Sequence, residues 1–136
     1  GGSAEEGRVP PRVVLCGPPG CGKTTMLAAL AATPHFSVLP LVMSDIISAG
    51  VGDTQAALQK HFLHAKQLQP ACVTLDDADM FFASIGRSHT IHDLLMELSF
   101  LLDSHCSVRL VFVATCSSRE RLPEQLGCRL HPIVLR

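Results

Sequence analysis

The sequence predicts an α/β fold in which a parallel sheet is covered by helices on both faces. From Arg12 onward, short apolar runs of strand length alternate with longer segments in which apolar residues recur at helical spacing. The short runs are apolar throughout, which is typical of strands whose two faces are both buried. With 136 residues, of which 47% are hydrophobic and 17% charged, the chain is long and apolar enough to build one ordinary core.

Five apolar runs are predicted strands, and two of them carry positional information. They cover residues 13–16, 36–42, 71–75, 109–114 and 133–135. Pro40 has no backbone N–H to give to a neighbouring strand, so the second run is expected at an edge or in an irregular position. The run Arg-Leu-Val-Phe-Val-Ala from Arg109 is the most hydrophobic, which predicts a central strand.

Three segments are predicted helices: residues 23–32, 53–68 and 90–102. The first is rich in Ala and Leu and ends before Pro34, and the second ends before Pro70. Asp53 or Thr54 can cap the start of the second helix. The third places six apolar residues on one face, which predicts packing against the sheet.

One domain is expected over residues 10–136, preceded by a leader over residues 1–9. The leader is small and acidic in character without periodicity, and its first three residues, Gly-Gly-Ser, resemble a cloning remnant. We therefore expect the leader to be disordered or vector-derived, and it takes no part in the fold prediction.

Composition excludes several classes of function. The formal net charge of −1 gives no broad attraction for nucleic acid, which requires clustered Lys and Arg. Neither a membrane-spanning run nor a signal peptide is visible, so we expect a cytoplasmic protein without membrane insertion. The six cysteines are scattered without metal-ligand spacing and are expected to be reduced core residues. His89 and His92 have ligand spacing, but nothing nearby completes a site, so Mg²⁺ is the only metal expected.

The segment Gly-Pro-Pro-Gly-Cys-Gly-Lys-Thr at residues 17–24 matches the phosphate-binding loop pattern G-x-x-x-x-G-K-[ST]. It follows a predicted strand and opens a predicted helix, where backbone N–H groups can surround phosphate oxygens at the positive end of the helix. Lys23, which we expect to face solvent and phosphate rather than the core, would add a cation to the β- and γ-phosphates, and Thr24 would give its hydroxyl to Mg²⁺. A glycine-rich turn that only links strand to helix is the alternative, and the register of all four fixed positions disfavours it. The residues expected to bind ATP or ADP are Gly17, Pro18, Pro19, Gly20, Cys21, Gly22, Lys23, Thr24 and Thr25.

Two acids, Asp76 and Asp77, directly follow the predicted strand at residues 71–75. The carboxyl ends of parallel strands form the rim where ligands bind in open sheets. Asp76 is expected to hold Mg²⁺ through its water shell, opposite Thr24. A strand that runs into a solvated turn can also end in acids, but the phosphate loop upstream favours the functional interpretation.

From Val13 onward these residues resemble the AAA branch of the AAA+ ATPases. The phosphate loop, the segment 44–53 and the run 111–115 are similar, respectively, to that branch's P-loop, pore-loop segment and first-sensor strand. The resemblance implies a P-loop NTPase fold with a five-stranded parallel sheet, the P-loop strand beside the sensor strand, and a hexameric ring. The helical lid of such domains would follow Arg136, so the resemblance leads us to expect a large subdomain without its lid. Two subgroups are similar and stay open: the second domain of the N-ethylmaleimide-sensitive fusion ATPase and the first domain of the peroxisome-biogenesis AAA proteins.

Four positions depart from the family pattern. Asp77 stands where active members carry Glu, and a shorter carboxylate can cost about a hundredfold in rate. Cys116 aligns with the Asn that senses the γ-phosphate, and Thr115 is the nearby substitute. Gly50 replaces the aromatic residue of the pore loop. Arg129 is the candidate arginine finger for a neighbouring subunit, with a solvated surface arginine as the alternative.

The sequence therefore favours an ATP-binding domain with weak hydrolysis of ATP to ADP and phosphate, and with a structural or regulatory role. It would belong to a larger ring-forming protein-remodelling ATPase, a homo- or hetero-hexamer that acts on a protein substrate or adaptor and can lie peripheral to an organelle membrane. Two alternatives remain open: a fully active translocase domain, in which Asp77 and Thr115 suffice, and a nucleotide-free scaffold domain.

Overall fold

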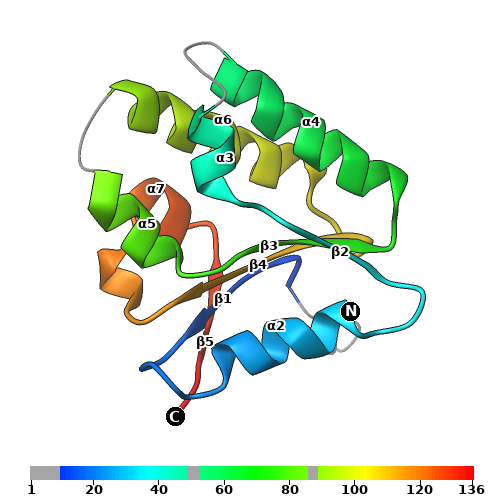
Figure 1. The fold of residues 1–136 in the computed structure, drawn as a ribbon, viewed down its shortest axis with the longest axis vertical. Helices are drawn as coiled ribbons and strands as arrows, with labels where there is room; N and C mark the ends of the chain where they lie inside the picture. Colours follow the sequence, from blue (N-terminus) through cyan, green and yellow to red (C-terminus); the bar gives the residue numbers. More distant parts are fainter. Residues whose placement is uncertain (1–9, 49–52, 86–88) are drawn as a thin grey trace, which may run out of the picture.

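A five-stranded, all-parallel sheet forms the centre of the molecule (Figure 1). The computed structural model describes residues 10–48, 53–85 and 89–136. The strands are β1 (Arg12–Cys16), β2 (Ser37–Pro40), β3 (Ala71–Leu75), β4 (Leu110–Cys116) and β5 (His131–Val134). Their spatial order is β2-β3-β4-β1-β5. The predicted α/β class and the five-stranded parallel sheet are confirmed.

The strand order also confirms three finer predictions. β4 occupies the middle of the sheet, as its hydrophobicity predicts, and only Val111 of its seven residues is not buried. β2, which ends at Pro40, lies at one edge, where a missing N–H leaves no neighbour unsatisfied. β1 lies beside β4, with Cys16 opposite Cys116 in the register. The two strand ends that carry the phosphate loop and the sensor position are therefore adjacent.

Helices cover both faces of the sheet, in unequal numbers. In Figure 1, α2 lies on one face, and α3, α4, α5, α6 and α7 lie on the other. Their bounds are α2 (Lys23–Ala31), α3 (Met43–Ser48), α4 (Asp53–Gln67), α5 (Ala78–Ile85), α6 (His89–His105) and α7 (Glu124–Gly127), with a 3₁₀ turn η1 (Arg119–Arg121). The three long helices were predicted. The short helices α3, α5 and α7 were not, because four to eight residues are too few to display a helical period.

Two separate apolar clusters fill the space between sheet and helices. The larger lies under α3 to α7 and contains the biggest fully buried side chains, including Phe62 and Phe112, whose rings stack with centroids 6.5 Å apart. The smaller lies under α2, and its buried members are Val13, Leu15, Cys72 and Val113. Leu27 and Leu30 of α2 pack against this second cluster.

Some predictions concern residues whose structure is not described. They are the leader at 1–9 and the pore-loop position Gly50. In the described part of the chain, no helix combines the length and apolarity that crossing a bilayer requires.

Candidate nucleotide-binding site

The phosphate loop connects the carboxyl end of β1 to the first turn of α2. Its first N–H, from Gly17, donates to the carbonyl of Cys116 over 3.2 Å and so extends the pairing of β1 with β4. The N–H of Cys21 then donates to the carbonyl of Pro18 over 3.2 Å, which closes a tight turn. The start of the loop is thus bonded to the sensor strand β4, and the residues that follow form a tight turn.

Glycine is required in this loop for two different reasons. A Cβ at Gly17 would lie 2.6 Å from the sulfur of Cys21 and 2.8 Å from the carbonyl oxygen of Leu135, so only glycine fits. Gly20 and Gly22 have φ angles of +84° and +101°, which side-chain-bearing residues rarely adopt. Apart from its chain neighbours, no heavy atom of the described residues lies within 4 Å of a Cβ built on either glycine, so the space beside them is open.

Lys23 lies inside the loop. Its side chain is only 8% exposed, and its ammonium donates a hydrogen bond to the carbonyl oxygen of Gly17. The sequence led us to expect this side chain to face solvent rather than to be buried, and that expectation is wrong. The ammonium thus donates to a carbonyl of the loop itself, and we expect a bound phosphate group to replace that acceptor.

The first turn of α2 presents donors to the same space. Gly22 is its N-cap residue and supplies no side-chain cap. The first N–H groups of a helix have no intrahelical acceptor, so they favour an anion. Thr24 and Thr25 are exposed, as are Pro18 and Pro19, so these predicted nucleotide-binding residues are accessible. Loop, helix start and ammonium together fit a phosphate, and the hydroxyl of Thr24 is a ligand type that Mg²⁺ accepts.

Asp76 and Asp77 lie in the turn between β3 and α5, and both are exposed. The register pairs Leu75 with Ala114, so Asp76 follows β3 at the level where Thr115 continues β4. The Thr115 hydroxyl donates to Asp76 Oδ1 and accepts from the N–H of Asp77 over 2.8 Å. Asp77 has a φ of +52°, in the left-handed region that Asp tolerates better than most residues. Carboxylate oxygens at this rim are suited to Mg²⁺.

The predicted sensor position, Cys116, is fully buried. Its sulfur lies 3.5 Å from that of Cys16 on the neighbouring strand. Burial raises the pKa of the Cys116 thiol to about 12, and the nearby Cys16 and Asp79 act in the same direction. The group is therefore a neutral thiol in the apolar interior. All six cysteines are free, and Cys16, Cys72 and Cys116 are buried as expected, whereas Cys128 is exposed.

A further acid of the site, Asp79 in the first turn of α5, was not predicted from the sequence. It is 1% exposed, and its Oδ2 accepts from the Ser117 hydroxyl over 2.6 Å and from the Ser117 N–H over 3.1 Å. Burial raises the pKa of this carboxyl, but the hydrogen bonds from Ser117 and from the N–H groups of Met80 and Asp79 outweigh it and hold the pKa below its usual value. The only sequence signal was a third acid three residues after Asp76.

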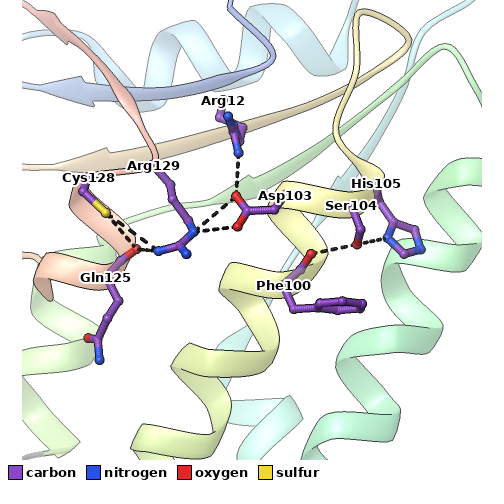
Figure 2. Close-up of polar contacts among 8 residues, drawn as sticks. All are labelled: Arg12, Phe100, Asp103, Ser104, His105, Gln125, Cys128 and Arg129. Atoms are coloured by element: carbon purple, nitrogen blue, oxygen red, sulfur yellow. Dashed lines mark hydrogen bonds and ion pairs between the residues drawn. The ribbon is translucent and has the colours of Figure 1, made fainter.

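Arg129 is held within its own chain. Figure 2 shows the guanidinium groups of Arg129 and Arg12 approaching the carboxylate of Asp103 on α6 from different directions. The Arg12 Nη1 lies 2.7 Å and the Arg129 Nε 3.1 Å from this carboxylate, and Arg129 Nη1 also donates to the carbonyl of Gln125 over 2.6 Å. Arg12 begins β1, whereas the phosphate loop follows its other end. The predicted arginine finger therefore pairs at the amino end of the sheet, away from the loop.

A cavity of about 660 Å³ adjoins the phosphate loop. On one side it is lined by Cys16, Gly17 and Pro18, and on the others by the segments 117–120 and 134–136, with Pro132. Its volume falls in the range of about 300–1,000 Å³ that is common for small-molecule sites. The carboxyl ends of β1, β4 and β5 thus frame a concave site beside the phosphate-binding groups.

These features define a P-loop nucleotide-binding domain, and comparison with known proteins places it more narrowly. The model of the ATPase family associated with various cellular activities (AAA) matches residues 13–135. Since this match covers nearly the whole sequence, the chain belongs to the AAA family.

Several curated proteins are similar over part of their length. The human ATPase family gene 2 protein homolog B is 38% identical over 81 residues, which is 60% of this chain and 11% of that protein. The ATPase family protein 2 homolog of Caenorhabditis elegans is 31% identical over 121 residues, 86% of this chain and 17% of that protein. The probable 26S proteasome regulatory subunit 6B of the same organism is 30% identical over 117 residues, 82% of this chain and 28% of that protein. The chain thus spans only a minor part of each relative.

Proposed function

We propose that this chain is an ATP-binding AAA domain that hydrolyses ATP slowly and has a structural or regulatory role in a larger ring-forming, protein-remodelling ATPase. The observation that carries the proposal is the combination of a complete phosphate cradle with a shortened acid. The loop, the first turn of α2 and the Lys23 ammonium form a set of donors suited to phosphate. The acid at the position of the usual glutamate is Asp77, which is one methylene shorter.

Each group in the site has a proposed role. The loop N–H groups and Lys23 bind the β- and γ-phosphates, and Thr24 with Asp76 would hold Mg²⁺, which neutralises phosphate charge when bound. Asp77 would orient or deprotonate the attacking water. Since its carboxylate reaches less far than that of Glu, the water is held less well and turnover is slow.

The wider assembly is also part of the proposal. The relatives include a proteasome regulatory subunit and ATPase family gene 2 proteins, so a hexameric ring with a protein substrate or adaptor is the assembly that we propose. The Asp-Asp pair supports a non-consensus subgroup within the AAA branch. We also propose that Arg129 acts as an arginine finger for a neighbouring subunit. The same proposal places the assembly in the cytoplasm, where it can associate with an organelle surface.

Titration with fluorescent mant-ATP tests nucleotide binding, with two variants at Lys23. Lys23→Ala and Lys23→Met both remove the ammonium, but Met keeps the apolar stem that fills the buried space. We expect both to weaken mant-ATP binding by at least about tenfold, since a charge-assisted phosphate contact is lost. Only Lys23→Ala should also lower the unfolding temperature.

Turnover separates the proposed function from its alternatives. A wild-type chain that binds neither mant-ATP nor mant-ADP would be a scaffold domain. If the assembled protein hydrolyses ATP at about 1 s⁻¹ or faster, in the range of ordinary enzymes, and Lys23→Met abolishes that rate, the domain is an active translocase. Tight binding with turnover well below that rate is the result that we expect.

A further inference from the structure

The polar side chains at the carboxyl end of β4 all donate hydrogen bonds to other groups of the same chain. Each hydroxyl or thiol has a single hydrogen to donate. The donors are Thr115, Cys116, Ser117 and Ser118, and the acceptors are, in the same order, the Asp76 carboxylate, the sulfur of Cys16, the Asp79 carboxylate and the Glu120 carboxylate. In this arrangement, none of the four side chains has a hydrogen left for the γ-phosphate.

Thr115 differs from the other three because it connects to both acids of the site. Its side chain is fully buried between the ends of β3 and β4. The single oxygen gives its hydrogen to Asp76 and receives the N–H of Asp77 over 2.8 Å. Both bonds join segments that lie almost forty residues apart in the sequence. Thr115 therefore fixes the side chain of one acid and the backbone of the other.

The backbone of Asp77 has reason to need this support. Its φ of +52° is a left-handed conformation that a residue with a side chain adopts only when its surroundings hold it. Asp also has one rotatable bond fewer than Glu, so the position of its carboxylate depends more strongly on the backbone. A small shift of this backbone would move the carboxylate away from the water that it is expected to orient.

We propose that Thr115 is a positioning residue that holds Asp76 and Asp77 in place and makes no contact with the γ-phosphate. The effect of Thr115 on hydrolysis rests on the proposed function, whereas its hydrogen bonds to Asp76 and Asp77 do not. It changes the role that the sequence indicated for Thr115, from a substitute sensor to a clamp between the two strand ends.

Whether Thr115 holds the backbone of Asp77 is tested by measuring hydrogen exchange of the Asp77 amide by NMR in the absence of nucleotide. Thr115→Val has nearly the same shape but no hydroxyl, Thr115→Ser keeps the hydroxyl, and Thr33→Val is a control at an exposed threonine on the far side of α2 from the loop. We expect exchange at Asp77 to accelerate by at least about tenfold in Thr115→Val and to stay within about threefold in Thr115→Ser and Thr33→Val. Equal exchange in all four proteins would overturn the clamp.

Whether Thr115 contacts the γ-phosphate, and whether hydrolysis depends on it, is tested on the same variants by titration with mant-ATP and mant-ADP and by single-turnover hydrolysis. We expect Thr115→Val to change the ratio of ATP to ADP affinity by less than about threefold, while the rate of hydrolysis falls by about tenfold or more. Thr115→Ser should recover most of that rate. If Thr115→Val weakens ATP at least tenfold more than ADP, Thr115 contacts the γ-phosphate and the proposal is wrong.

These outcomes also separate the clamp from the proposed function. A wild-type chain that binds neither nucleotide would refute the proposed function, yet the exchange of the Asp77 amide would still decide whether Thr115 holds this backbone. Conversely, unchanged hydrolysis in Thr115→Val, together with faster exchange, would show that the clamp exists but that turnover does not depend on it, which overturns its positioning role.

Discussion

The side chain and the backbone of Asp77 place opposite demands on the residue at this position. A longer carboxylate would reach further toward an attacking water, whereas a φ of +52° favours short polar residues such as Asp and Asn. Asp fits the backbone conformation at this position, but its carboxylate extends less far than that of Glu.

Asp77→Glu should therefore have two opposite effects. We expect hydrolysis to rise, by up to about a hundredfold if reach is the only limitation. We expect the free energy of unfolding to fall by about 0.5–1 kcal/mol, because Glu tolerates the left-handed region less well than Asp. Single-turnover hydrolysis and urea denaturation measure the two effects.

Asp77→Asn is the matched control for that substitution. It keeps a short polar side chain that tolerates the same φ, so the free energy of unfolding should change by less than about 0.5 kcal/mol. Hydrolysis should become undetectable, since the amide cannot accept a proton. Flat hydrolysis in Asp77→Glu would show that something other than carboxylate reach limits turnover.

Among the site residues, those that belong to a local pattern could be predicted from the sequence. The phosphate loop lies between strand and helix as its spacing indicates, and Asp76 and Asp77 lie at the rim of the sheet. The burial of Lys23 and the bonds of Thr115 depend on which strand ends meet, so no spacing could reveal them. Asp79 was missed because an acid in the first turn of a helix is ordinarily solvated.

At the scale of elements, Asp79 joins the start of α5 to the segment after β4. The native state holds its pKa below the usual value, so folding favours the ionised form. Its contribution to stability is therefore present above the pKa of the unfolded chain, about 3.9, and is lost as pH falls through the lower native pKa. Urea denaturation between about pH 5 and pH 3 should show this loss.

Asp79→Asn should flatten that dependence. The variant keeps an oxygen acceptor for Ser117 but cannot ionise, so its unfolding free energy should fall less than that of the wild type as pH is lowered. At pH 7 we expect it to be less stable than the wild type, because the ionised acceptor makes the stronger hydrogen bond. Equal slopes in both proteins would mean that other carboxylates cause the acid dependence.

Asp103 anchors the segment between α7 and β5 through Arg129. The pair is partly exposed, with side-chain exposures of 30% for Arg129 and 49% for Asp103, so we expect a coupling energy of only about 0.5–1 kcal/mol. A double-mutant cycle of Asp103→Asn and Arg129→Met, followed by urea denaturation, measures it. A coupling energy near zero would argue that Arg129 is free to leave, which an arginine finger requires.

The elements that sequence patterns predicted well are those whose burial is either uniform along the element or regularly periodic. β4 is apolar over its whole length and is central, and α4 and α6 show clear helical periodicity. The predicted third helix ended at Leu102, whereas α6 continues through polar residues to His105, where the Ser104 hydroxyl bonds to the carbonyl of Phe100 (Figure 2). Hydrophobic spacing cannot detect a helical turn that is polar.

At the scale of the whole molecule, the two faces of the sheet are unequally covered. Among the helices that the structure describes, five lie over the larger cluster and only α2 lies over the smaller one. Several apolar residues around the smaller cluster are only partly buried. The sequence indicated that helices cover both faces, but it did not indicate how unequally. The distribution depends on the face of the sheet on which each connecting helix lies. The helix that begins the phosphate site is thus the least enclosed of the long helices.

This inequality predicts different consequences for two core truncations. Phe62→Ala removes a fully buried ring that stacks on Phe112 and should lower the free energy of unfolding by about 3–5 kcal/mol. Leu27→Ala acts on a half-buried side chain under α2 and should cost about 1–2 kcal/mol. Because Lys23 is the only residue of α2 that is buried in the described part of the chain, we further expect the amides of α2 to exchange through local opening at a lower free energy than those of β4. Native-state hydrogen exchange would then show Leu27→Ala loosening α2 while leaving β4 less affected, and Phe62→Ala loosening both. If Leu27→Ala lowers protection equally in α2 and β4, the two layers unfold as one unit, and the phosphate-binding helix has no independent mobility.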